Sequence, residues 1–189
     1  MAHVGETIEH PLTGERITFL ETAGSTGGKF MRARLDVRPG GAIPNLHVHP
    51  GAEEQFAVAE GRLQVRRAKQ TWVAKAGETV IVPPGTAHVW GNPFDEPAAV
   101  IVDLRPALRA ETFLETFFGL ARDGKVDPKR NLPKSLLQAA LMFHDYRAEV
   151  QLPGIAGVGV RGLSAVLAPL ARARGYRSRY PQYSGPESP

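Results

Sequence analysis

The stretch His-Val-His-Pro-Gly-Ala-Glu-Glu, residues 47–54, holds two of the chain's six histidines and two adjacent carboxylates. Because side chains alternate between faces along an extended chain, His47 and His49 point the same way. Pro50 and Gly51 then supply a turn, so one of the two glutamates meets both imidazoles across a hairpin. Such a set suits a divalent metal ion, with Fe, Mn, Ni, Cu, Co and Zn as candidates. The competing interpretation is a surface hairpin tip with solvated histidines.

A second segment, GETVIVPPGTAHVWGN, spans residues 77–92 and strengthens the metal hypothesis. It reads as a buried strand, a rigid Pro83-Pro84-Gly85 turn and a further strand that opens with His88. The rigid turn fixes the direction of the His88 side chain, as a metal ligand requires. A third histidine from a separate hairpin completes a set of three histidines and one glutamate.

The rest of residues 1–104 also carries short apolar or alternating runs between Gly- and Pro-containing turns, which predicts a mainly β sandwich or small barrel. After Leu104 the period changes to that of helices, so we expect a helical extension over residues 105–176 and a flexible tail over 177–189. The chain has 189 residues and no cysteine, which excludes disulfides, thiolate metal sites and cysteine nucleophiles.

The two segments resemble the paired motifs of the cupin superfamily, in particular its single-domain, cupin-2-type members. The motif G-x5-H-x-H-x3,4-E-x6-G is matched by Gly41, His47, His49, Glu54 and Gly61, and G-x5-P-x-G-x2-H-x3-N by Gly77, Pro83, Gly85, His88 and Asn92. The resemblance implies a jelly-roll barrel, a double-stranded β-helix, with one metal ion in its mouth. It implies four metal ligands: His47, His49, Glu54 and His88. Glu53 fits the shorter His-to-Glu spacing, but only Glu54 also leaves six residues before Gly61.

Strand alternation predicts which side chains lie next to this metal site. Phe56 shares the inward face of Glu54, and Trp90 shares that of His88. They are candidates for the wall of a substrate pocket, although both also suit a plain barrel core. No general base is evident; Glu53 is the nearest spare carboxylate and is the candidate catalytic residue.

The helical extension has apolar helix faces that must be covered. Phe113, Leu114, Phe117 and Phe118 share one such face, and we expect them to pack on the barrel or on a partner subunit, which predicts a homodimer. Residues 152–171 have the length of a membrane span, but Arg161 at their centre argues against a transmembrane segment. We expect a helix with Leu163, Val166, Leu167 and Leu170 on one face that packs on the barrel or a partner. Interfacial membrane contact is the alternative.

The charge distribution sets limits on partners. Residues 103–189 hold thirteen Lys/Arg against eight Asp/Glu, whereas residues 1–102 hold ten against eleven. No basic stripe is interleaved with aromatic residues, so we expect no nucleic-acid binding. The first twenty residues contain no hydrophobic signal region, which favours a cytoplasmic location.

Two functional hypotheses follow. The first is a mononuclear metal enzyme acting on a small organic molecule, an oxygenase by preference because a thiolate-free, histidine-rich site suits redox metals. Isomerases, cyclases and lyases complete the repertoire that the resemblance implies. The second is a non-catalytic, metal-containing module that binds or senses a small ligand, since one fold hosts many functions.

Overall fold

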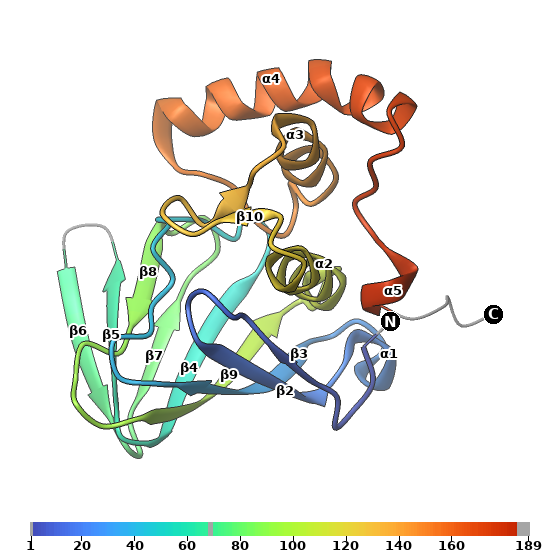
Figure 1. The fold of residues 1–189 in the computed structure, drawn as a ribbon. Helices are drawn as coiled ribbons and strands as arrows, with labels where there is room; N and C mark the ends of the chain where they lie inside the picture. Colours follow the sequence, from blue (N-terminus) through green and yellow to red (C-terminus); the bar gives the residue numbers. More distant parts are fainter. Residues whose placement is uncertain (1, 68–69, 185–189) are drawn as a thin grey trace.

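The computed structural model describes residues 2–67 and 70–184, which form a two-sheet barrel with helices on one side (Figure 1). The larger sheet has the strand order β1-β2-β3-β9-β4-β7 and the smaller one β6-β5-β8. The strands are β1 (Thr7–Glu9), β2 (Glu15–Glu21), β3 (Met31–Val37), β4 (Glu53–Glu60), β5 (Arg62–Arg67), β6 (Gln70–Lys75), β7 (Thr79–Val82), β8 (His88–Gly91) and β9 (Ala98–Arg105). The expected mainly β jelly-roll barrel with a helical C-terminal region is confirmed.

The barrel core follows from alternation along its central strands. In β3, the residues Met31, Ala33, Leu35 and Val37 are buried. The intervening Arg32 lies on the outer face and forms an ion pair with Asp103 of β9, with 2.7 Å between Nε and Oδ1. The sheet therefore has one apolar side, which faces the barrel interior, and one polar side.

The two motif segments meet inside the barrel, but not through a regular strand at residues 47–49. Instead, His47 and His88 form an isolated antiparallel bridge, and Val48 forms another with Gln151. The expected alternation still brings the imidazoles of His47 and His49 together, because the backbone around Val48 is extended by these two bridges.

The helices are α1 (Ala23–Thr26), α2 (Ala110–Arg122), α3 (Leu136–Asp145), α4 (Gly154–Ala173) and α5 (Pro181–Ser184), and a short hairpin of β10 (Val126–Asp127) and β11 (Leu132–Pro133) precedes α3. Figure 1 shows α2 nearest the barrel, α3 beyond it and α4 outermost. Phe118 of α2 belongs to the barrel core, and Leu114 and Phe117 pack against it. The expectation that this helix face covers the barrel is therefore met within one chain.

Helix α4 does not use the expected face for packing within this chain, so packing of that face on a partner subunit stays a prediction. The helix begins at Gly154 and continues through Pro169 to Ala173. Its buried residues are the small ones, Gly157, Ser164, Ala168 and Ala171, because a close approach to α3 selects small side chains. Of the four larger residues expected to pack, Leu163, Val166 and Leu170 are exposed in this chain and Leu167 is half-buried. Ile155 and Val158 are exposed as well.

Helix α4 is also long and apolar enough to span a membrane on length and composition alone. It is the one such helix among residues 2–67 and 70–184.

The prediction of a flexible tail over residues 177–189 is wrong for residues 177–184. Residues 177–184 lead into α5, where Tyr183 is buried against α2 and packs with Leu120 and Ala121. A glycine at position 119 makes room for this ring, since a Cβ there would lie 2.3 Å from Tyr183 Cγ. Residues 185–189 lie outside the described residues.

Candidate metal centre

Four side chains from three separate segments converge at the barrel mouth. His47 and His49 come from the segment before β4, Glu54 from β4 and His88 from the start of β8. One potential ligand atom from each lies within 4.8 Å of every other. We call these four residues the His/Glu cluster. His88 is fully buried, and His47 and Glu54 are 8% and 6% exposed.

Backbone carbonyls orient all three imidazoles. The Nδ1 atoms lie 3.0 Å from the carbonyl oxygen of Asn45 for His47, 2.6 Å from that of Glu149 for His49, and 3.0 Å from that of Thr86 for His88. A carbonyl only accepts hydrogen bonds, so each Nδ1 carries the proton and donates it. Each imidazole therefore keeps its Nε2 for the cluster, where Nε2 serves as a metal ligand once it carries no proton of its own.

The electrostatics of the cluster favour the metal-binding states of His47 and Glu54. Burial, with the charges of His49 and His88, lowers the pKa of His47 to about 3, which keeps this imidazole neutral at pH 7. Burial alone raises the pKa of Glu54, but the charge and contacts of His49 and the contact with His88 outweigh it and hold the pKa below its usual range. Burial lowers the pKa of His49, yet the charge and hydrogen bond of Glu54 and the hydrogen bond to the Glu149 carbonyl together outweigh burial and raise it. A bound metal ion takes the place of the proton that this raised pKa favours.

The donor set fits a divalent metal ion. Metal–nitrogen and metal–oxygen bonds of about 2.0–2.2 Å place two ligands of one ion at most about 4.4 Å apart, so the observed spacing needs only small side-chain shifts. Glu54 Oε2 already lies 2.7 Å from His88 Nε2 and 3.4 Å from His49 Nε2. Three nitrogens and one carboxylate oxygen leave one or two positions open on an ion that prefers five or six ligands.

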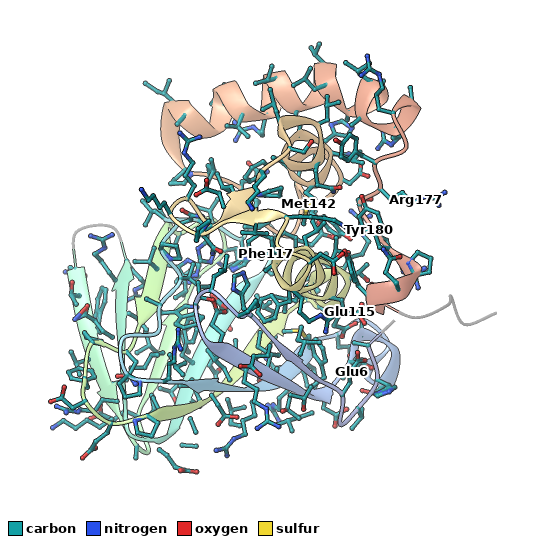
Figure 2. The ribbon with its side chains drawn as sticks, viewed as in Figure 1. Glu6, Glu115, Phe117, Met142, Arg177 and Tyr180 are labelled. Carbon is teal, nitrogen blue, oxygen red and sulfur yellow. The ribbon has the colours of Figure 1, made fainter. Side chains whose placement is uncertain are left out.

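Three residues of the His/Glu cluster, His47, His49 and Glu54, lie in the wall of an apolar cavity of about 180 Å³, which we call the chamber. Barrel residues line one side, and the helical extension lines the other. Phe117 of α2 and Met142 of α3, labelled in Figure 2, belong to the helical side. The helices therefore cover the barrel on the side of the chamber.

The predicted pocket residues Phe56 and Trp90 both line the chamber. Both are also part of the barrel core, at 0% and 5% exposed, and their ring centroids lie 6.4 Å apart. Glu53 lies on the opposite face of β4 from Glu54, paired with Arg105 in the register of β4 and β9. Among the described residues that line the chamber, Glu53 is absent. The structure thus separates this candidate base from the cluster.

The structure instead places another carboxyl residue, Glu149, beside the cluster, and the sequence did not suggest it. Glu149 is buried, lines the chamber and supports His49 through its carbonyl oxygen. Two further hydrogen bonds of 2.9 Å, between the backbone of Val48 and that of Gln151, attach this segment to the stretch that carries both histidines. No local motif marks Glu149, because its position depends on how α3 and α4 place the segment between them.

Comparisons with known proteins agree with this description. Residues 33–103 match the sequence model of the cupin domain. The chain is 36% identical over 85 residues to the polyketide synthase CurC of Streptomyces cyaneus, covering 45% of this chain and 53% of CurC. It is 31% identical over 141 residues to germin-like protein subfamily 3 member 3 of Arabidopsis thaliana, covering 71% and 61%. The chain thus spans about half the length of the curated relatives it matches.

A solved structure, of a predicted oxalate decarboxylase from Thermotoga maritima, aligns with a TM-score of 0.47 at 20% identity. The alignment covers 53% of this chain and 90% of that one. The region matched by the cupin model runs from β3 to β9 and contains all four residues of the His/Glu cluster. The chain thus carries a match to the cupin domain over residues 33–103 of its barrel.

Proposed function

We propose that this protein is a mononuclear metal-dependent enzyme that acts on a small organic molecule, with oxygenase chemistry as the first choice and isomerase, cyclase or lyase chemistry next. One observation carries the proposal: the His/Glu cluster has room for further ligands, and three of its residues line an apolar chamber that helices cover on one side. An apolar pocket next to open coordination positions supports an enzyme over a non-catalytic binding or sensing module.

The residues of the chain have separate tasks in this proposal. His47, His49, Glu54 and His88 hold the ion, and the carbonyls of Asn45, Glu149 and Thr86 keep the imidazoles in the metal-binding orientation. When bound, the metal supplies Lewis-acid or redox activation of a substrate oxygen. Phe56 and Trp90 position the carbon skeleton of the substrate, and α2 and α3 exclude water. A carbon-rich substrate also agrees with the similarity to a polyketide synthase.

The assembly and the location stay predictions. We propose a homodimer, for which the exposed apolar face of α4 is the available surface, and a cytoplasmic site of action.

The test is elemental analysis of freshly purified protein. We expect about one divalent metal ion per wild-type chain and a loss of most of it in the His47→Ala, His88→Ala double variant. His144→Ala is the matched control, because His144 is half-buried on α3 and outside the cluster. Oxygen uptake with phenolic and diketone compounds then tests the oxygenase assignment. Equal metal content in the wild type and the double variant would contradict the ligand set.

A further inference from the structure

Two buried oxygen atoms in the chamber wall have no hydrogen-bond partner among residues 2–67 and 70–184. They are Oε2 of Glu149 and Oδ1 of Asn131, in side chains that are 5% and 6% exposed. Both residues line the chamber. A buried acceptor without a donor costs about 1–3 kcal/mol, so such atoms in a pocket wall indicate where a ligand is expected to donate hydrogen bonds.

Both residues are attached to the supports of the metal-binding histidines. The carbonyl of Glu149 accepts the hydrogen bond of His49 Nδ1 at 2.6 Å. The side-chain amide of Asn45 donates to the carbonyl of Asn131 at 3.1 Å, and the carbonyl of Asn45 holds His47 Nδ1. Glu149 and Asn131 therefore belong to the end of the chamber that carries the His/Glu cluster.

The chemistry of Glu149 restricts what its free oxygen can contact. The other oxygen, Oε1, accepts hydrogen bonds from Arg109 Nε at 3.0 Å and from the Arg109 backbone N–H at 3.2 Å. A carboxylate held by a guanidinium in this way is an acceptor only. Its Oε2 atom can be satisfied by a hydroxyl, but it repels a carbonyl oxygen.

The size and lining of the chamber restrict the rest of the ligand. Apart from the few polar residues at the cluster end and Glu15, its walls are aliphatic and aromatic. An apolar cavity of about 150 Å³ is known to hold benzene. The present volume of about 180 Å³ therefore suits one substituted ring or two fused rings.

We propose that the substrate class of this chamber is a compact phenolic compound, with one hydroxyl donating its hydrogen to Oε2 of Glu149 beside the metal centre. The inference rests on the proposed function, because it concerns the same site, and it names Glu149 as the residue that selects hydroxyls over ketones. A site built to hydrogen-bond a hydroxyl rejects an analogue that lacks it, since the buried polar group is then left unpaired.

The test uses two probes with the same carbon skeleton, 1-naphthol and 1-tetralone, on full-length protein. Binding is measured by calorimetry first in EDTA and then with the metal restored. Because metal-free protein is used first, the selectivity of Glu149 is separated from coordination by the ion. We expect wild-type protein in EDTA to bind 1-naphthol at least about 10-fold more tightly than 1-tetralone.

Two variants complete the design. In Glu149→Gln, Arg109 retains the carbonyl oxygen as its partner and the amide N–H₂ faces the chamber, so we expect the preference to reverse towards 1-tetralone. Asn131→Asp keeps an acceptor at its position and is expected to retain the preference for 1-naphthol. If Glu149→Gln does not fold, the two probes on the wild type still decide the result.

Equal binding of the two probes by the wild type would overturn the inference, as would an unchanged preference in a folded Glu149→Gln variant. These outcomes differ from a failure of the proposed function. Loss of the metal assignment appears in elemental analysis, whereas the hydroxyl preference is measured in protein that contains no metal.

Discussion

At the scale of single residues, Glu15 at the start of β2 is the clearest source of pH dependence. Its side chain is 3% exposed, and burial raises its pKa from 4.5 to about 7, against the hydrogen bond from Thr13. Between these values the unfolded chain has already released the proton that the folded chain retains. The contribution of Glu15 to the free energy of unfolding therefore falls as the pH rises from about 4.5 to about 7, and then levels off.

We predict that Glu15→Gln removes this decline. The variant should gain up to about 3 kcal/mol relative to the wild type at pH 8 and nothing at pH 4, as measured by urea unfolding in EDTA. Glu54 and His47 have lowered pKa values, so they contribute stability that is lost as the pH falls. The difference between the two curves isolates Glu15, because these other groups are common to both proteins. A constant difference across the pH range would contradict the prediction.

At the scale of elements, the motif glycines have different physical roles. Gly61, between β4 and β5, has a φ of 70°, and a Cβ there would lie 2.3 Å from the carbonyl oxygen of Pro97. Gly77, before β7, has a φ of 87°, but no described atom lies within 4 Å of its Cβ position. Both turns need the left-handed region, and only the turn at Gly61 also needs the missing side chain.

These two positions form a matched pair of variants. Gly77→Ala should cost about 1 kcal/mol of unfolding free energy, the price of the left-handed conformation. Gly61→Ala should cost at least about twice as much, because the backbone at Pro97, directly before β9, must also shift. Urea unfolding measures both. Equal losses would show that the turn at Gly61 relaxes around the new methyl group.

The elements of this fold differ in whether the sequence predicts them. Turn glycines and alternating strands predict the barrel, because these signals are local, and the motif spacing predicts the cluster. The position of Glu149 and the outward face of α4 were not predicted. Both depend on contacts between segments distant in the sequence: Glu149 reaches His49 only through the bridge between Val48 and Gln151, and Ser164 and Ala168 of α4 are buried in place of its leucines.

At the scale of the whole molecule, α4 presents an apolar face that other elements leave uncovered. Ile155 is 93% exposed and Val166 is 73% exposed. Gly159 and Gly162 lie beside them, with no described atom within 4 Å of their Cβ positions. An exposed apolar patch of this kind marks an interaction surface, and the glycines allow a second helix to approach closely.

We therefore predict that two copies associate through α4. Size-exclusion chromatography with light scattering should give a dimer for the wild type and a monomer for the Ile155→Asp, Val166→Asp variant. Val73→Asp is the control, since Val73 is an exposed apolar residue on β6 of the barrel, and it should remain dimeric. A wild-type monomer that instead floats with lipid vesicles would assign this face to a membrane surface.

The carbonyl that supports His49 has a consequence for biosynthesis. It belongs to Glu149, 100 positions later in the chain, and Gln151 follows it. During translation the imidazole of His49 leaves the ribosome long before this support exists. The metal centre is thus completed only after α2 and α3 have been made, and ion loading is expected to follow their synthesis rather than accompany that of the strands.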